Sequence, residues 1–407
     1  SILEKLTKNK LMGVLLGAVV TAVIQSSSAT TVMVVGFVNS GIMKLTQSIS
    51  VMMGANIGTT MTAWILSLSD IQGGSFIANL FKPETFTPVL AVIGIILIMM
   101  AKKDKNKHIG TILIGFAVLM FGMETMSSSV DDLKQSEQFA QMFIMFSNPI
   151  LGFIVGAVLT AIIQSSSASV GILQALSIGG GISYATAIPI IMGENIGTCI
   201  TAILSAIGAS KNAKRAAMAN LYVKFISAVL FMVVFYAINA VVHFAFMDMD
   251  INAFYIAVIH TLFNVVSTII LLPFTNLIEK LVRMTIKEGA EKNEFAILDE
   301  RFLDTPSFAV EQCMTLATNM AYMVKDSFTL AQECVAKYSE SLDKKIIETE
   351  NIADEYEDAL GVYLVKLSAV NLNESDSQKV SILLHAISDF EKMTDYTADL
   401  VFTAREK

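Results

Sequence analysis

The chain has 407 residues, of which 54% are hydrophobic and only 16% charged, and its formal net charge is −8. A typical soluble domain is about one-quarter charged, so this composition excludes a single large soluble enzyme and indicates a membrane protein. Residues 1–275 carry 14 Lys/Arg and 11 Asp/Glu, whereas residues 276–407 carry 14 and 25. The chain therefore combines an apolar body with an acidic, water-exposed tail. Because that tail would repel phosphate groups of a nucleic acid, no nucleic-acid partner is expected.

The apolar body contains ten hydrophobic segments, and a helix needs about 20 residues to cross the hydrocarbon core of a bilayer. Four segments are shorter and form two pairs, 11–24 with 29–39 and 149–163 with 168–178, each divided by a Gln-Ser-Ser-Ser run. Two half-length helices around a polar tip predict a re-entrant hairpin, because such backbone is tolerated in a membrane only beside protein or a watery cavity. The other six segments are 45–68, 87–101, 109–126, 184–207, 218–246 and 253–279.

The body contains an internal duplication. Residues 17–29 are similar to residues 156–168, and residues 53–59 to residues 192–198, both at an offset of 139 residues. Two motifs that share one offset predict a repeated structural unit. Segment 109–126 precedes the second hairpin, and its equivalent would lie before the first residue, so we expect a further N-terminal helix in the natural protein.

The number of crossings predicts the topology of the repeats. Three segments lie between the hairpins, so the second hairpin enters from the opposite face and the repeats are inverted. Lysines test this arrangement, because loops rich in Lys and Arg stay on the cytoplasmic side. Lysines are frequent in residues 102–107 and 211–215, whereas the loops at 69–86 and 127–148 carry one each. The acidic tail therefore follows the last span into the cytoplasm.

The two polar tips suit an oxyanion and a hard cation. Consecutive serines offer hydroxyl groups and the free N–H groups of a helix N-terminus, which favour an anion. Hydroxyl and carbonyl oxygens are the ligands that a hard cation such as Na⁺ prefers. The body has one arginine, Arg215, which lies in a predicted loop. We therefore expect co-bound Na⁺ to supply the charge that a bound anion needs.

Glycines are expected to have two roles. Paired glycines in each Gly-x-Asn-Ile-Gly-Thr stretch are predicted to unwind the middle of a span and free carbonyl groups, as in the discontinuous helices of secondary transporters. Glycines at a spacing of four, Gly13 with Gly17 and Gly152 with Gly156, are expected to pack the two arms of each hairpin together.

Each polar residue also has a structural interpretation. Serines in a membrane helix can pack or bond to the carbonyl of the preceding turn, and Asn56 and Asn195 can form interhelical hydrogen bonds. Glu194 is either a functional carboxylate inside the membrane or a protonated structural one. Lys224 is expected near a membrane edge, with its ammonium group extended to water.

The doubled Gln-Ser-Ser-Ser motif, each copy followed by Gly-x-Asn-Ile-Gly-Thr, resembles the type II sodium-phosphate cotransporter family over about residues 1–280. The resemblance implies sodium-driven transport of inorganic phosphate by alternating access, with both tips at one central site. Glu194 and Cys199 depart from the family pattern, which puts the cation site of the second repeat in question. For phosphate, the resemblance implies the tip serines Ser26, Ser27, Ser28, Ser165, Ser166 and Ser167, and we add Gln25, Asn56 and Asn195 as candidates. For Na⁺, it implies Gln164, Ser165, Thr198 and Thr201, and we add Thr59 as a candidate.

The tail is predicted to form three helices over 309–338, 341–368 and 376–407. Acidic pairs at i, i+4 lie on one face of a helix, where they can share a metal ion or simply be solvated. The run from Ser388 to Asp395 resembles a PhoU domain, the phosphate-regulatory module, which implies a metal cluster of divalent or iron type. The tail has the length of one three-helix bundle, so we expect it to correspond to half of the usual PhoU tandem. The acidic residues are Glu350, Asp354, Glu391 and Asp395.

The sequence therefore predicts an all-α, polytopic protein of the cell membrane with two inverted repeats and a cytoplasmic three-helix bundle. Each repeat is expected to contain a re-entrant helical hairpin and a broken helix. No His, Lys or Asp recurs near the serine tips to activate a nucleophile, so a hydrolase is not expected. A sodium-coupled carrier of sulfate or a dicarboxylate, or a phosphate sensor with little transport, stays open, as does a homodimer. The predicted domains are 1–138, 139–280, a linker at 281–300, and 301–407.

Overall fold

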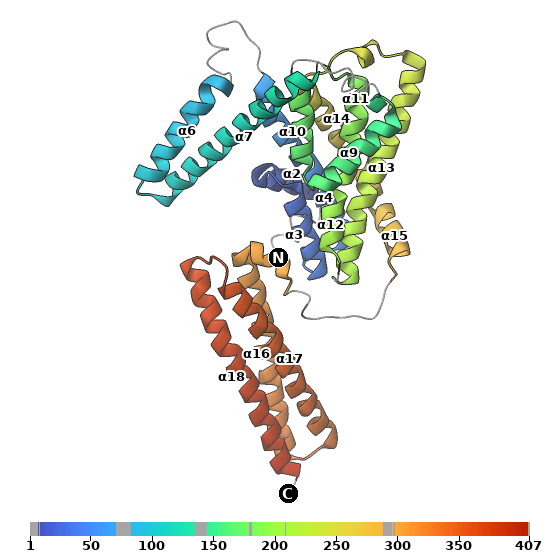
Figure 1. The fold of residues 1–407 in the computed structure, drawn as a ribbon. Helices are drawn as coiled ribbons and strands as arrows, with labels where there is room; N and C mark the ends of the chain where they lie inside the picture. Colours follow the sequence, from blue (N-terminus) through green and yellow to red (C-terminus); the bar gives the residue numbers. More distant parts are fainter. Residues whose placement is uncertain are drawn as a thin grey trace. The chain divides into compact units, whose positions relative to one another are not determined.

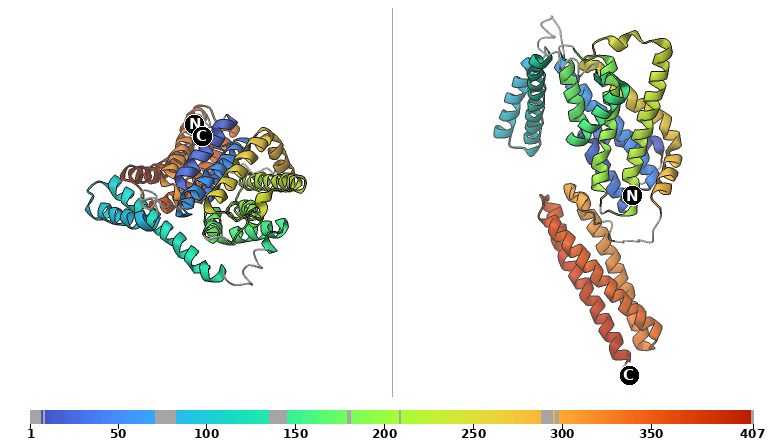
Figure 2. Two further views of the ribbon diagram at one scale, coloured as in Figure 1. Left: turned by 90° about the horizontal axis from the view of Figure 1, so that it is seen from above. Right: turned by 45° about the vertical axis from the view of Figure 1, so that its right-hand side comes forward.

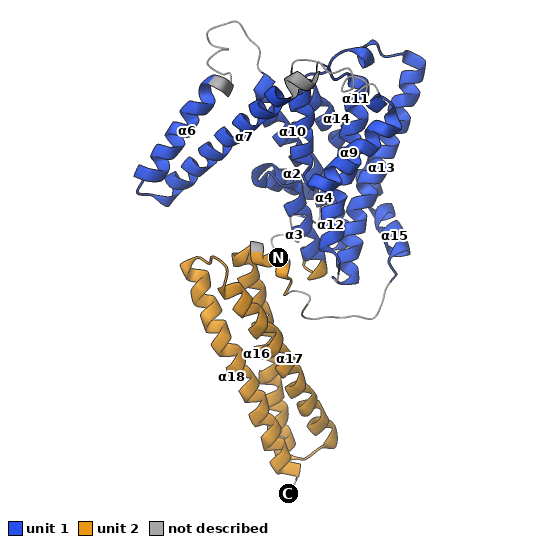
Figure 3. Cartoon of the chain, in the orientation of Figure 1, with its two compact units in different colours: residues 1–38, 43–288 blue, residues 39–42, 289–407 orange. Residues whose placement is uncertain are grey.

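The computed structural model describes residues 7, 9–70, 83–134, 145–178, 181–207, 209–287, 295 and 298–405. Every regular element within these ranges is a helix, which confirms the predicted all-α fold. The chain divides into two compact units, one of residues 1–38 and 43–288 and the other of residues 39–42 and 289–407 (Figure 3). The predicted boundary near residue 138, most of the loop at 69–86, and parts of the 127–148 loop and of the 281–300 linker lie outside the described residues.

Among the described residues of unit 1, five helical stretches are long and apolar enough to span a membrane, whereas the sixth predicted span, 87–101, corresponds to a shorter apolar helix over Thr85–Met100. The last predicted span divides at Leu272–Phe274, where a short 3-10 turn η3 contains a proline that cannot donate a helical hydrogen bond. The helices of these stretches are α4 (Leu45–Ser67), α7 (Asp104–Lys134), α11 (Tyr184–Gly197), α12 (Cys199–Ser205), α13 (Lys211–Val242), α14 (Ala253–Leu271) and α15 (Thr275–Thr285).

Each predicted hairpin is a pair of short helices separated by its polar tip. The pairs are α2 (Lys10–Ile24) with α3 (Ser27–Asn39), and α9 (Pro149–Ile163) with α10 (Ser166–Ser177). In Figure 1, α3 leads into α4 at the lower end of unit 1, whereas α10 leads into α11 at the upper end. The two hairpins therefore point in opposite directions, as inverted repeats require.

Glycines bring helices of the first repeat into backbone contact. A Cβ atom at Gly17 of α2 would collide with the carbonyl of Val51 on α4, and one at Gly54 of α4 would collide with the carbonyl of Val14 on α2. Only glycine allows two helix backbones to approach so closely. The first arm of the hairpin is thereby locked along α4.

The second repeat has the same crossing between α9 and α11. Gly156 faces the carbonyl of Ile190, and Gly193 faces the carbonyl of Phe153. The expectation that the small residues pack the two arms of a hairpin together was wrong. Gly13 also faces α4, at Ser50, because the apolar face of each first arm is covered by the long helix that follows the hairpin.

The two Gly-x-Asn-Ile-Gly-Thr stretches differ in backbone structure. In the second repeat, α11 ends at Gly197 and α12 begins at Cys199, but Thr198 between them keeps right-handed helical dihedral angles (φ −65°, ψ −15°), so the interruption is one residue long and the span is not unwound as predicted. In the first repeat, α4 continues through Gly54 and Gly58, and the prediction of a broken helix was wrong there. These glycines face α2 and form part of the helix crossing, so their small size serves packing and the helix stays intact.

The helices α6 (Pro83–Met100) and α7 form an antiparallel pair at one edge of unit 1 (Figures 1 and 2). They pack through Gly94 and Gly110, each of which lies against the backbone carbonyl of the other. Met120 and Met123 of α7 are buried in a cluster with residues of α4 and α10. The pair therefore contacts the rest of the unit through one face of α7.

Unit 2 consists of three long helices that run side by side (Figure 2). They are α16 (Pro306–Ala336), α17 (Glu340–Ser368) and α18 (Glu374–Arg405), preceded by the short turn η5 (Glu300–Asp304). Apolar residues recur every three or four positions and face the centre of the bundle, as expected for amphipathic helices. At one end, Arg405 forms an ion pair with the buried Asp343, which also accepts a hydrogen bond from Tyr338 at 2.9 Å.

Candidate functional site

The glutamines of both polar tips have the same unusual backbone conformation. Gln25 has a φ of 59° and Gln164 a φ of 60°, both in the left-handed region. Each donates its backbone N–H at 2.7 Å to the carbonyl of a threonine one turn earlier, Thr21 or Thr160. Left-handed residues other than glycine are uncommon and concentrate at functional sites. The repeated sequence therefore forms the same sharp turn twice.

The first serine of each tip begins the second arm of its hairpin. Ser26 Oγ accepts a hydrogen bond from the N–H of Ala29 at 3.2 Å, and Ser165 Oγ accepts one from Ala168 at the same distance. These are N-cap bonds, which satisfy one of the free N–H groups at a helix start. The remaining N–H groups of the first turn have no partner within the helix. Each tip can therefore offer serine hydroxyls and a helix N-terminus to an anion.

The glutamine side chains of the two tips have different surroundings. Gln25 Oε1 accepts a hydrogen bond from Thr62 Oγ1 of α4 at 2.8 Å. The equivalent pair in the second repeat, Gln164 and Thr201, is not joined: Gln164 is exposed, and Thr201 Oγ1 donates to the carbonyl of Thr198 at 2.9 Å. Within the described ranges, no hydrogen bond connects one tip to the other. A common central site for both tips therefore stays a prediction.

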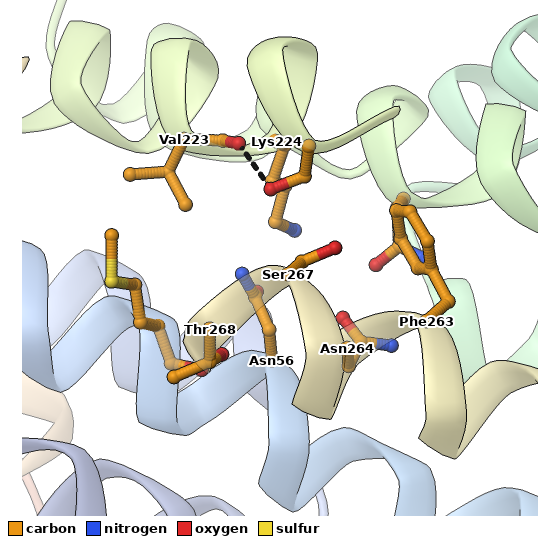
Figure 4. A pocket seen from close by; sticks show the side chains of 10 residues that line it. Asn56, Val223, Lys224, Phe263, Asn264, Ser267 and Thr268 are labelled. Atoms are coloured by element: carbon orange, nitrogen blue, oxygen red, sulfur yellow. Dashed lines mark hydrogen bonds between the residues drawn. The ribbon is translucent and has the colours of Figure 1, made fainter. Parts of the chain in front are cut away.

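The equivalent asparagines of the two repeats, Asn56 and Asn195, line one small cavity. The space can hold about one water-sized species. Figure 4 shows Asn56 of α4 facing polar residues of α13 and α14 across this cavity. The other lining residues are Met53, Val223, Lys224, Ser227, Phe263, Asn264, Ser267 and Thr268. None of the tip serines lines it in this conformation.

Lys224 is buried inside unit 1, with 5% of its surface exposed. Its Nζ donates to Thr198 Oγ1 at 2.5 Å, at the interruption between α11 and α12. The expectation that Lys224 lies near a membrane edge was wrong. The helix α13 begins at Lys211, before the apolar segment expected from residue 218, so Lys224 lies about 20 Å from the helix start. Its neighbours on α4, α11 and α14 prevent it from reaching water.

Glu194 is the other buried ionisable group of this region. It is 1% exposed, and neither of its carboxylate oxygens has a hydrogen-bond partner among the described residues. It precedes Asn195 on α11 but does not line the cavity. The structural and functional interpretations of Glu194 are both compatible with this position.

The threonines proposed as Na⁺ ligands bond within their own helices. Thr59 Oγ1 donates to the carbonyl of Ala55 at 2.9 Å, and Thr198 Oγ1 donates to the carbonyl of Asn195 at 2.7 Å. A hydroxyl that donates its proton keeps lone pairs that can accept from a cation. Neither threonine lines the cavity, but Thr198 accepts a hydrogen bond from Lys224, which does.

Sequence analysis missed several residues around the cavity. His260, Asn264 and Thr268 recur on α14 at intervals of four residues, and Ser267 lies three residues after Asn264, which places them on one helix face. This polar stripe in an apolar span was a usable signal. A second missed residue is the fully buried Gln174 of α10, whose Nε2 donates at 2.9 Å to backbone carbonyls of both α4 and α14.

In unit 2, three of the acidic residues proposed as metal ligands come together. Side-chain oxygens of Glu350, Asp354 and Asp395 all lie within 4.8 Å of one another, between α17 and α18. Burial and repulsion by Asp354 and Asp395 raise the pKa of the Glu350 carboxyl. Burial and repulsion by Asp395, Asp354 and neighbouring Glu357 likewise raise the pKa of Glu391. Carboxylates that repel one another in this way are suited to bind a cation, because the cation would neutralise their repulsion.

Comparisons with known proteins agree with this description. The family model for the Na⁺/Pi-cotransporter matches residues 1–128 and again 118–255, and the model for the PhoU domain matches residues 317–402. The chain is 24% identical over 419 residues to Escherichia coli YjbB, which is named for inorganic phosphate export, covering 100% of this chain and 74% of that protein.

Two further relatives match shorter stretches. The uncharacterized protein YqeW of Bacillus subtilis is 31% identical over 281 residues, covering 69% of this chain and 86% of YqeW. The mouse sodium-dependent phosphate transport protein 2A is 33% identical over 107 residues, covering 24% of this chain and 17% of that protein. No solved structure matches.

Proposed function

This chain belongs to the Na⁺/Pi-cotransporter family and carries a PhoU domain, and on that premise we propose that it transports inorganic phosphate in step with Na⁺. The observation that carries the proposal is the identical turn at Gln25 and Gln164, which begins a helix in each of two oppositely directed hairpins. Two inverted repeats of this kind can exchange conformations, so that a site between them opens to either side in turn.

Phosphate binding is assigned to the two tips. The N-terminal ends of α3 and α10 supply partial positive charge, and the tip serines supply hydroxyl donors, so no arginine is needed. Asn56 and Asn195 would join the site when the cavity between the repeats widens. The proposed phosphate ligands are Gln25, Ser26, Ser27, Ser28, Ser165, Ser166, Ser167, Asn56 and Asn195.

Sodium binding is assigned to neutral oxygen atoms near the tips. Hydroxyl, amide and carbonyl oxygens suit Na⁺, and a cation beside the phosphate offsets the anion's charge in a site of low dielectric constant. Phosphate is then held weakly until Na⁺ binds, and this dependence couples the transport of phosphate to the transport of Na⁺. The proposed Na⁺ ligands are Gln164, Ser165, Thr198, Thr201 and Thr59.

The test is uptake of radioactive phosphate into liposomes that contain the purified full chain. We expect an inward Na⁺ gradient to drive accumulation, and replacement of Na⁺ by choline to abolish it. Unlabelled phosphate should compete, whereas sulfate and dicarboxylates should not. Reversing the Na⁺ gradient in preloaded liposomes measures export by the same protein. Sodium-independent flux, or equal competition by sulfate, would contradict the proposal.

Variants separate a transporter from a sensor. Ser166→Ala and Gln164→Ala should reduce uptake, while Ser128→Ala on the exposed face of α7 should leave it unchanged. If the wild-type protein binds phosphate but moves none under any gradient, the sensor function is favoured instead.

We also propose that the bundle faces the cytoplasm and binds a divalent or iron-type metal through Glu350, Asp354, Glu391 and Asp395. The raised pKa values of Glu350 and Glu391 mean that, without metal, the bundle loses stability as pH rises through those pKa values. A bound cation should remove this loss. A metal at 100 times its dissociation constant stabilises the folded state by about 2.7 kcal/mol.

Thermal unfolding of the full chain with Mn²⁺ or with a chelator, at acidic and neutral pH, tests the metal proposal. The stabilisation by Mn²⁺ should be greatest at neutral pH and should disappear in Asp354→Asn. The exposed Glu333→Gln on α16 serves as the control and should respond to Mn²⁺ as the wild type does. No stabilisation at either pH would contradict the proposal.

A further inference from the structure

We propose that Lys224 is a built-in cation: its ammonium group occupies the cation site of the second repeat, beside Thr198, where a coupling Na⁺ would otherwise bind. The inference rests on the proposed sodium-coupled function and deepens it. It changes the number of Na⁺ ions that accompany each phosphate.

The buried ammonium charge of Lys224 requires nearby groups that stabilise it. The side chain is 5% exposed and lies near the middle of α13. No carboxylate forms an ion pair with it in the described part of the chain, although Glu194 is buried on the neighbouring α11. A buried ammonium without a carboxylate must be stabilised by oxygen atoms that accept hydrogen bonds.

The amides around the cavity provide such acceptors. Asn195 Nδ2 donates to the carbonyl of Ile191 at 3.3 Å, and Asn264 Nδ2 donates to the carbonyl of His260 at 2.8 Å. Because each amide nitrogen is bonded to its own helix, the amide oxygens stay available to accept. Both asparagines line the cavity next to Lys224.

The hydroxyls around the cavity follow the same pattern. Ser227 Oγ donates to the carbonyl of Val223 at 2.7 Å, the bond drawn in Figure 4, and Thr198 Oγ1 donates to the carbonyl of Asn195 at 2.7 Å. Their protons are therefore already bonded, so their lone pairs stay available to accept. Ser227 lines the cavity, and Thr198 lies beside it as the acceptor of the Lys224 ammonium. A small space surrounded by acceptor oxygens has the chemistry of a Na⁺ site, and it is large enough for about one ion or water.

The ammonium and a Na⁺ ion therefore compete for the same oxygens. Lys224 contacts Thr198, which is itself a proposed Na⁺ ligand. In the first repeat, the threonine equivalent to Thr198 at the offset of 139 is Thr59, which bonds to its own helix and accepts no lysine ammonium in the described part of the chain. A tethered charge is present in one repeat only, so one of two equivalent cation sites does not require Na⁺.

The experiment measures how many Na⁺ ions move with each phosphate. The full chain in liposomes takes up labelled Na⁺ and labelled phosphate together, and the ratio is compared between wild type and Lys224→Gln. Removal of the ammonium should open the site to Na⁺, so the ratio and the Hill coefficient for Na⁺ should each rise by about one. Lys224→Arg, which keeps the charge, should retain the wild-type ratio.

A binding measurement covers the case in which Lys224→Gln no longer transports. Na⁺ should then raise the thermal stability of detergent-solubilised Lys224→Gln more than that of the wild type. Lys214→Gln, on the exposed part of the same helix, should match the wild type in every assay.

Three results would overturn the proposal: an unchanged Na⁺ response of Lys224→Gln in both assays, a raised KM for phosphate without any change in Na⁺ dependence, or a Na⁺ ratio in Lys224→Arg equal to that in Lys224→Gln. Failure of the proposed function itself would look different, because the wild type would then show no Na⁺-dependent phosphate uptake.

Discussion

In the first repeat, α4 runs unbroken past Asn56, and Thr62 on that helix bonds Gln25 at the tip. In the second repeat, the equivalent helix is interrupted at Thr198, and Thr201 bonds to its own backbone. The glutamines and threonines are the same residue types in both repeats, so the difference is conformational. The comparison teaches that a repeated motif fixes a local turn, whereas the helices packed around it decide how its side chains are used.

The surroundings of the two motifs differ as well. The glycine crossings of α2 with α4 and of α9 with α11 are equivalent, so they do not cause it. The second repeat instead has Lys224 against Thr198, and Glu194 where the first repeat has Ala55. The interrupted helix of the second repeat therefore has a buried ammonium group and a buried carboxyl group beside it, whereas the continuous helix of the first repeat has an alanine in place of the carboxyl group.

The largest expected effect tests whether the glycine crossings are truly equivalent. Gly17→Val and Gly156→Val should each lower the free energy of unfolding by about 3 kcal/mol or more, because the new side chain would collide with a backbone carbonyl. Thermal unfolding of the purified protein in detergent measures the loss. Gly115→Val on α7 is the control, since a Cβ there meets nothing within 4 Å. Tolerance of valine in one repeat only would break the equivalence.

A second test separates the shape of the tip from its chemistry. Glycine adopts positive φ without cost, so Gln164→Gly should keep the free energy of unfolding within about 0.5 kcal/mol of the wild type or raise it. If the Gln164 amide is a ligand, phosphate uptake should nevertheless fall about tenfold, as expected for one lost ligand bond. Gln25→Gly should also lose about 1 kcal/mol of stability, because its bond to Thr62 disappears. Unaltered uptake by Gln164→Gly would remove that residue from the site.

The smallest expected effect concerns the threonines of the two repeats. Thr62→Val should destabilise the protein by about 1 kcal/mol, since it breaks the bond between α4 and the first tip. Thr201→Val removes only a bond to its own helix, so its stability should change by a few tenths of a kcal/mol, about as for a surface change. Thr201→Val should weaken the apparent affinity for Na⁺ only if the second repeat binds Na⁺, and should leave that affinity unchanged if Lys224 occupies the site. Equal stability losses in chemical denaturation would show that the repeats do not differ at this position.

Much of the architecture could be predicted from the sequence. Segment lengths and the shared offset predicted the helices, the two hairpins and their opposite directions, because a bilayer imposes a fixed length on each span. The doubled motif also predicted the family that the comparisons confirm. The turns at Gln25 and Gln164 occur where the polar runs divide the apolar segments.

The glycine and lysine predictions failed for a common reason. From sequence, a glycine pair can either loosen a helix or allow another helix to approach, and the choice depends on which helix lies opposite. Lys224 is a similar case, because its burial depends on where α13 begins and on neighbours from three other helices. Neither the helix opposite a glycine nor the surroundings of a lysine can be read from the sequence next to that residue.

The sequence by itself determined the membrane body, the duplicated tips, the family and the acidic tail, since these depend on composition and on patterns along the chain. Only the tertiary structure decided that α4 stays continuous, that Asn56 and Asn195 line one cavity, and that Lys224, which also lines it, contacts Thr198. Residues 56, 195 and 224 are far apart in the chain. Their chemistry depends on acceptor oxygens from four helices, and such a combination exists only after those helices have packed.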